Sequence, residues 1–154
     1  MRVLLKFEID CTPDAAWNAL CSPAGLREVS SPLMSFRSLE PQGFPDLWSE
    51  GGHPLAVKAL GLVPVGEQLI DISFDEKSDA RIVRDSGGGL SGPLSLVDYW
   101  EHSMAVSPAP GGRTLYRDQL VYSAGLFTVA MWPVLWSFWQ WRGAGIRRLA
   151  PTWE

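Results

Sequence analysis

Histidine, cysteine and charge are all scarce in this sequence. The chain of 154 residues has two histidines and two cysteines, and only 19% of its residues are charged. The cysteines do not form a C-x-x-C pair, and no cysteine and histidine residues have the spacing of a zinc site. No metal ion or other cofactor is therefore expected. Cys11 and Cys21 are expected to be buried free thiols, as in a protein of the reducing cytoplasm.

A basic surface and an export signal are missing as well. The formal net charge is −4, and no cluster of lysine and arginine is interleaved with aromatic residues, so nucleic acid is not expected as a partner. Residues 1–7 hold only short apolar runs broken by Lys6, which are too short for the apolar segment of a signal peptide. We therefore expect a cytoplasmic protein with one domain, residues 1–154.

Apolar periodicity predicts a strand, two short helices and then a series of strands. Residues 3–9 alternate with a period of two, which is typical of a strand. Thr12-Pro13 and Ser22-Pro23 each combine a capping side chain with a proline that suits the first helical position. The strand-like runs that follow cover residues 34–39, 55–60, 65–74, 80–85, 94–106 and 114–122.

The end of the chain predicts one long helix, residues 126–150. Pro133 should kink this helix or mark its true start, because an interior proline costs about 3 kcal/mol. The uncharged run 119–141 is long enough for a transmembrane helix. However, part of it belongs to the last strand, and the break at 123–125 shortens the apolar helix. A helix of the core is therefore the preferred interpretation.

The same helix holds four of the eight tryptophans, at positions 132, 136, 139 and 141. Its apolar side chains surround the axis, whereas a helix that lies on a sheet normally buries one stripe only. Part of this surface should therefore contact something besides its own sheet. A homodimer through Trp139 and Trp141 is the first expectation, coverage by the two short helices the second and peripheral membrane contact the third.

The order of these elements resembles the helix-grip fold of the SRPBCC or START-like superfamily. That superfamily includes polyketide cyclases and dehydrases, lipid-transfer domains and plant pathogenesis-related allergens. The resemblance implies an α+β fold, in which a curved antiparallel sheet, two short helices and a long C-terminal helix enclose an apolar cavity. It implies no shared catalytic residues, because one such fold serves many functions. The segments that carry the resemblance are 7–13 with Trp17, 92–94 with 100–104, 112–114 with 118–122, and 146–149.

A glycine-rich run, residues 87–92, formally matches the G-x-G-x-x-G pattern. A dinucleotide site needs a helix directly afterwards, but here Pro93 and a predicted strand follow. We therefore expect a flexible loop, which in the resembling fold could sit at the mouth of the cavity. His53, between glycines and a proline, is expected to be exposed in another loop.

The last two predicted strands bring a histidine and a carboxylate together. If their hairpin centres on Pro110, His102 lies opposite Asp118, Met104 opposite Tyr116 and Trp100 opposite Leu120. The pair could be a polar anchor or general base in the cavity, or a purely structural pair. A slip of one residue in the register would instead destroy it.

Binding of an apolar small molecule or lipid in the cavity is the leading functional hypothesis. Aromatic residues would supply contact area, and His102 with Asp118 would supply orientation. A polyketide cyclase or dehydratase type of enzyme with His102 as general base is one alternative. A peripheral membrane or partner-binding module is the other. The residues expected to line the cavity are Trp100, His102, Met104, Asp118, Leu120 and Trp136.

Overall fold

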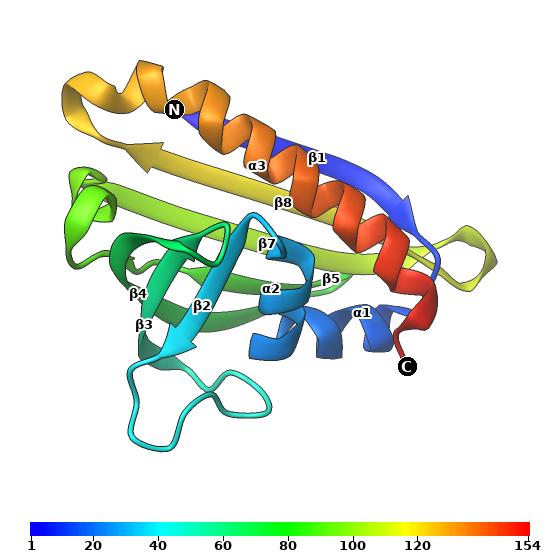
Figure 1. Ribbon diagram of the computed structural model, residues 1–154. Helices are drawn as coiled ribbons and strands as arrows, with labels where there is room; N and C mark the ends of the chain where they lie inside the picture. Colours follow the sequence, from blue (N-terminus) through cyan, green and yellow to red (C-terminus); the bar gives the residue numbers. More distant parts are fainter.

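The computed structural model describes residues 1–154 and shows a curved antiparallel sheet crossed by one long helix (Figure 1). The helices are α1 (Pro13–Leu20), α2 (Pro23–Ser30) and α3 (Thr128–Leu149). The strands are β1 (Arg2–Ile9), β2 (Met34–Ser38), β3 (Gly51–Ala59), β4 (Val63–Lys77), β5 (Ala80–Asp85), β6 (Gly88–Gly89), β7 (Tyr99–Ala109) and β8 (Arg113–Ser123).

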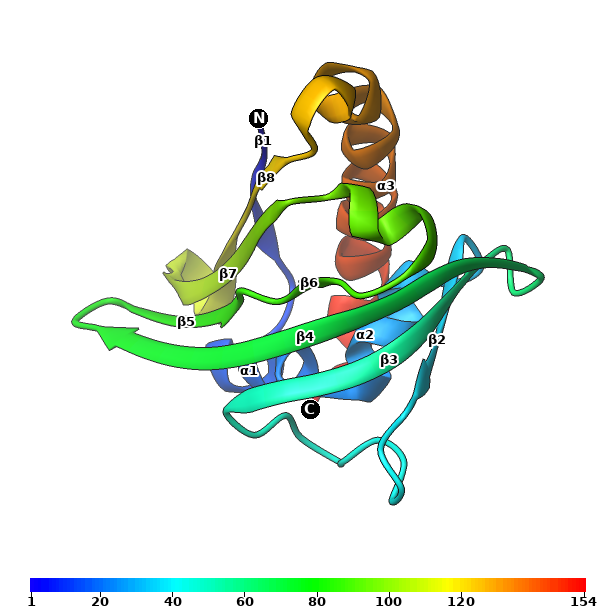
Figure 2. The same cartoon turned by 90° about the vertical axis from the view of Figure 1, so that its left-hand side faces the viewer.

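The strands run in the order β1-β8-β7-β5-β4-β3-β2, and β6 adds a short pairing to β4. Every pairing is antiparallel. Figure 2 shows the long strands β3 and β4 sweeping around one side, with α3 on the other, so that the sheet forms a cup. Helix α3 packs against β1 and α2. This arrangement confirms the predicted α+β helix-grip fold.

Both short helices begin as the sequence predicts. The Thr12 Oγ1 accepts a hydrogen bond from the Ala15 N–H at 3.2 Å, and the Ser22 Oγ accepts one from the Gly25 N–H at 2.9 Å. Each cap satisfies a backbone donor that the first helical turn leaves without a partner. The two helices close one end of the cup beneath the C-terminal half of α3 (Figure 1).

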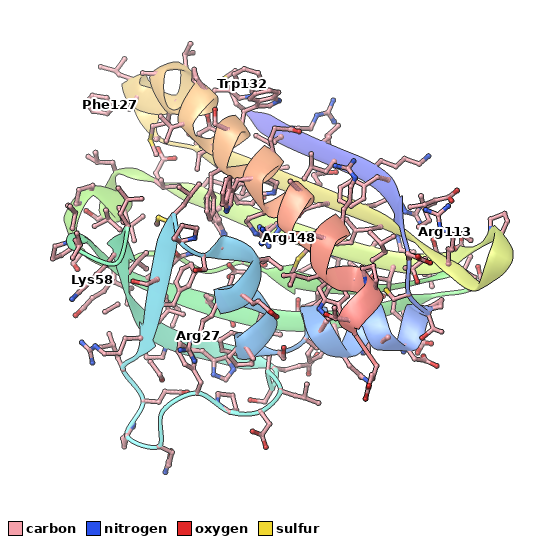
Figure 3. All side chains as sticks on the ribbon, turned by 45° about the vertical axis from the view of Figure 1, so that its right-hand side comes forward. Arg27, Lys58, Arg113, Phe127, Trp132 and Arg148 are labelled. Carbon is pink, nitrogen blue, oxygen red and sulfur yellow. The ribbon has the colours of Figure 1, made fainter.

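Helix α3 continues through Pro133 and begins five residues before it, so Pro133 does not mark its start. Two bonds fix this start to the end of β8: the Tyr122 hydroxyl donates to the Thr128 carbonyl at 2.7 Å, and the Ala124 N–H donates to the Thr128 Oγ1 at 2.8 Å. The Trp132 indole N–H donates to the Arg2 carbonyl of β1 at 3.2 Å. Figure 3 shows Trp132 beside the beginning of β1.

No helix combines the length and the apolar character that a membrane crossing requires.

The predicted strand 94–106 is wrong in its first part. Residues Gly92–Leu96 form a 3-10 turn, and β7 starts only at Tyr99. Gly92 has a φ of +64°, which favours glycine and leads the chain into the turn. Pro93 then occupies the start of the turn, where its missing N–H costs nothing.

His53 is not an exposed loop residue, contrary to expectation. It lies in β3 and is 7% exposed. Its ring packs against Trp48, with centroids 5.0 Å apart, and its Nε2 lies 2.9 Å from the Ser49 carbonyl oxygen. Glycine beside a histidine and a proline is typical of a loop, but Gly52 lies within strand β3, where a side chain would crowd the Leu69 side chain of β4.

The glycine-rich run 87–92 is closely packed rather than flexible. Gly88 and Gly89 pair with Leu69 and Gln68 of β4. A side chain on Gly89 would overlap the Leu94 carbonyl, and one on Gly87 would overlap the Leu69 carbonyl. Glycine is needed here because two backbones touch.

Candidate functional site

Two adjoining cavities lie between the sheet, α2 and α3. The larger has a volume of about 140 Å³ and is lined by 18 residues, 11 of them hydrophobic. The smaller has a volume of about 50 Å³ and is also mainly apolar. A void of about 150 Å³ in a protein core can hold a benzene molecule, so the larger cavity has room for more than a few atoms. The residues that line both cavities are Leu26, Ile70, Asp85, His102 and Arg142.

The walls of the larger cavity come from more of the chain than the sequence predicted. Helix α3 contributes one stripe, and β7 contributes two residues. The other lining residues come from α2, from strands β2, β4 and β5, and from the 3-10 turn after β6 with the residue that follows it, whereas β8 contributes no lining side chain. Gly88 and Gly89 are part of the wall, in line with the expectation that the glycine run borders the cavity. The stripe on α3 is Met131, Leu135, Phe138, Trp139 and Arg142.

A buried polar cluster centres on Asp118, which is 2% exposed. Its Oδ1 accepts hydrogen bonds from the His102 Nε2–H at 2.9 Å and from the Trp139 indole N–H at 2.8 Å. Its Oδ2 accepts one from the Tyr116 hydroxyl at 2.6 Å. The predicted contact between His102 and Asp118 is therefore confirmed. Trp139 was not expected in it.

The register behind this contact differs from the predicted one by two residues. His102 lies directly opposite Leu120, and Asp118 lies opposite Met104. The hairpin centres on Gly111, which has a φ of +76°. Because side chains alternate with a period of two, a shift of two keeps both residues on the same face. The contact survives as a diagonal one, which is within reach of long side chains.

The cluster keeps Asp118 ionised. Burial alone would raise its pKa, but the charge and hydrogen bond of His102, the charge of Arg142 and the hydrogen bond of Tyr116 outweigh burial and lower the pKa to about 2. A carboxylate at that position can only accept hydrogen bonds. The His102 Nε2 must therefore carry its proton and donate it to Asp118.

A second buried carboxylate, Asp85, borders both cavities. It ends β5 directly opposite His102. Its Oδ2 accepts a hydrogen bond from the Trp100 indole N–H at 3.1 Å, and its Oδ1 accepts two backbone N–H groups, of Asp71 and Gly87. Burial raises its pKa, although these bonds and His102 oppose the rise. Asp85 does not stand out in the sequence, because a single carboxylate at a strand end also fits a turn.

Arg142 is the second residue that sequence reasoning missed. A cation near the end of a helix is favoured by the helix dipole, which gives Arg142 a role without any site, but the side chain is 4% exposed and lies in both cavity walls. The spacing of apolar residues along α3 does indicate that Arg142 faces inward. Met131, Leu135, Phe138 and Arg142 follow one helical face at intervals of three and four residues, so the arginine continues an apolar stripe.

The six residues expected to line the cavity lie in three kinds of place. Trp100 and His102 border the larger cavity, and His102 also borders the smaller one with Met104. Asp118 and Leu120 are fully buried behind this wall and border neither cavity. Trp136 lies outside the cavity stripe of α3 and is 43% exposed.

The tryptophans of α3 divide between core and surface. Trp139 is 2% exposed, so a second copy of the chain could not reach it, and this part of the expected homodimer contact is wrong. Trp141 is 39% exposed, and its indole N–H donates to the Ser31 carbonyl after α2 at 3.1 Å. The short-helix region therefore covers part of Trp141.

Comparison with known proteins gives structural matches only. No protein-family model matches the sequence, and no curated protein is significantly similar to it. A hypothetical protein from Helicobacter pylori is similar with a TM-score of 0.68 at 12% identity, over 97% of this chain and 88% of that one.

Two further structures carry functional names. A point mutant of Thalictrum norcoclaurine synthase, in complex with a transition-state analogue, is similar with a TM-score of 0.65 at 14% identity, over 97% of this chain and 93% of that one. The Aha1 dimer from Colwellia psychrerythraea has a TM-score of 0.61 at 12% identity, over 98% of this chain and 96% of that one.

These likenesses define the class of fold. The chain has a helix-grip fold, the fold that its sequence resemblance to the SRPBCC or START-like superfamily implied. Identities this low show the fold alone. The function of this particular protein therefore has to be inferred from its own cavity.

Proposed function

We propose that this protein binds a small apolar molecule or the apolar part of a lipid in the larger cavity. The observation that carries this proposal is the mainly apolar cavity of about 140 Å³ beside a polar cluster. Pockets for small molecules are typically apolar with a few placed polar groups that fix orientation. Here His102, Asp85 and Arg142 meet at one wall, and hydrocarbon side chains form the others.

Filling the cavity should abolish binding without unfolding the protein. The Leu135→Trp variant enlarges a side chain that lines the larger cavity. The matched control is Leu126→Trp, the same exchange at a position that is 98% exposed before α3. Native mass spectrometry of the purified wild type should reveal a retained small molecule. Leu135→Trp should lose it and Leu126→Trp should keep it, whereas retention by both variants would contradict binding in this cavity.

A cyclase or dehydratase type of reaction in the same cavity is our second candidate. It is favoured by one observation: His102 borders both cavities while a buried carboxylate holds its Nε2–H. That bond leaves Nδ1 as the ring nitrogen able to accept a proton, so Nδ1 would act as general base. If a substrate is found, His102→Gln should abolish its turnover and leave its binding in place. Unchanged turnover would remove this candidate.

We also propose that the beginning of α3 contacts a membrane surface. Its apolar side chains are unusually exposed: Val129 is 72% and Val134 70% exposed, besides Leu126. Figure 3 shows Phe127 projecting away from the ribbon at this end of the helix. Flotation with phosphatidylcholine vesicles should carry the wild type upward and leave a Val129→Ser/Val134→Ser variant behind. Wild type that stays at the bottom would contradict this contact.

A further inference from the structure

Arg142 is a buried cation whose N–H groups lack an oxygen acceptor. A guanidinium keeps its charge in proteins and offers five donors, and this one is 4% exposed. Its Nε has no hydrogen-bond partner. One terminal nitrogen has only the Met104 sulfur, a weak acceptor, at 3.7 Å.

The remaining neighbours do not satisfy the other terminal nitrogen. It lies 3.4 Å from the His102 Nε2, but that nitrogen already carries the proton it donates to Asp118, so two donors face each other. The Asp118 Oδ2 is 4.0 Å away, which allows attraction between the charges but no hydrogen bond. The face of the Trp139 ring, 5.0 Å from the guanidinium carbon, adds a cation–π contact without an acceptor.

We infer that Arg142 receives the carboxylate of a small apolar acid bound in the larger cavity, an inference that rests on the proposed cavity-binding function. Arg142 borders that cavity, and a carboxylate is the group that matches the planar pair of donors of a guanidinium. Leaving the donors without acceptors would be costly in a buried site. The apolar body of the acid would lie against the stripe Leu135 and Phe138 of α3.

The surrounding charges limit the head group to one negative charge. Asp118 is ionised beside Arg142, and Asp85 borders the same cavity. A group with two charges, such as a phosphate monoester, would meet the Asp85 carboxylate at the cavity wall and lie near the Asp118 carboxylate behind it, with a single cation to balance its charge. The volume of the cavity matches an aromatic ring of benzene size.

Benzoate and benzamide form a suitable pair of probes, because they have nearly the same shape and differ in charge. Binding can be followed by two-dimensional NMR of the indole N–H groups. The signals of Trp100 and Trp139, which border the larger cavity, should shift, whereas those of Trp132 and Trp141 should not. Wild type should bind benzoate about 10- to 100-fold more tightly than benzamide, since hydrogen bonds to charged groups have that strength.

The Arg142→Met variant keeps an apolar stem and removes the charge. It should bind both probes with equal, weak affinity, while Arg142→Lys should keep part of the preference for benzoate. Arg148→Met is the matched control, because Arg148 is exposed on the same helix, and it should behave as wild type. If Arg142→Met does not fold, the probe ratio of the wild type and the Arg142→Lys variant still decide.

The outcomes separate the two proposals. Equal binding of both probes by the wild type, or a preference for benzoate that survives in Arg142→Met, would overturn the role of Arg142 and leave cavity binding in place. If neither probe shifts the Trp100 and Trp139 signals at millimolar concentration, cavity binding is overturned for ligands of this size. The carboxylate site is then overturned with it.

Discussion

Replacement of Asp118 by asparagine tests the polar cluster through its dependence on pH. The pKa of Asp118 is lowered from 3.8 to about 2, chiefly by His102 and Arg142 acting against burial. One pKa unit corresponds to about 1.4 kcal/mol, so ionised Asp118 contributes about 2 kcal/mol to the free energy of unfolding. A lowered pKa makes this contribution complete above the unfolded value of 3.8. It is lost as the pH falls from about 4 towards about 2.

The free energy of unfolding should be measured by urea denaturation at a series of pH values. At neutral pH, Asp118→Asn should be less stable than wild type by at least about 2 kcal/mol, because an amide also offers donors to a site that already supplies three. The difference should shrink by about 2 kcal/mol in acid. Asp79→Asn, at an exposed position before β5, should match wild type throughout. A loss for Asp118→Asn that is equal at all pH values would refute the ionised cluster.

Three further predictions concern other parts of the molecule. Gly89→Ala should reduce the free energy of unfolding by about 1–3 kcal/mol, because its new side chain would overlap the Leu94 carbonyl. Gly88→Ala is the control, since a side chain there has open space. Equal effects of the two exchanges in urea denaturation would contradict this packing. For ligand-free Arg142→Met, the free energy of unfolding should fall by less than about 1 kcal/mol, since no hydrogen bond to an oxygen acceptor is lost. A fall of about 3–5 kcal/mol would instead identify Arg142 as an essential ion-pair partner of Asp118. Burial raises the pKa of Cys21 to about 12, against a weaker opposing effect of Arg81. Mass spectrometry should therefore find half-buried Cys11 alkylated before Cys21 in the native protein at mildly alkaline pH. Faster modification of Cys21 would contradict this expectation.

Local patterns in the sequence were sufficient for most of the fold. The two Ser/Thr-Pro caps, the alternation in β1 and the strand 80–85 each depend on neighbouring residues, and all are confirmed. The hairpin register depended instead on where the turn centres. Pro110, Gly111 and Gly112 offer several centres, and Gly111 and Gly112 both adopt a positive φ. The observed pairing of Ala109 with Arg113 centres the hairpin on Gly111. The expected face was still right, because the error was two residues and not one.

The polar site was only half predictable for a related reason. His102 and Asp118 lie on adjacent strands, so alternation alone places them on one face. Arg142 and Asp85 reach the site through the packing of α3 and the curvature of the sheet, which join parts of the chain far apart in sequence. Trp136 and Trp139 show the same limit. They lie three positions apart on the same helix, yet only Trp139 faces inward, and this depends on how α3 is rotated against the sheet.

The bond between Trp132 and Arg2 also covers part of one border of the sheet. The sheet is open, with β1 at one border and β2 at the other. Free backbone groups at such borders can pair with another chain and start aggregation. The Trp132 indole occupies one carbonyl of the β1 border. The β2 border is only five residues long and carries an exposed charge, Arg37. A tryptophan outside the cavity thus helps to keep one copy of the sheet from extending into the next.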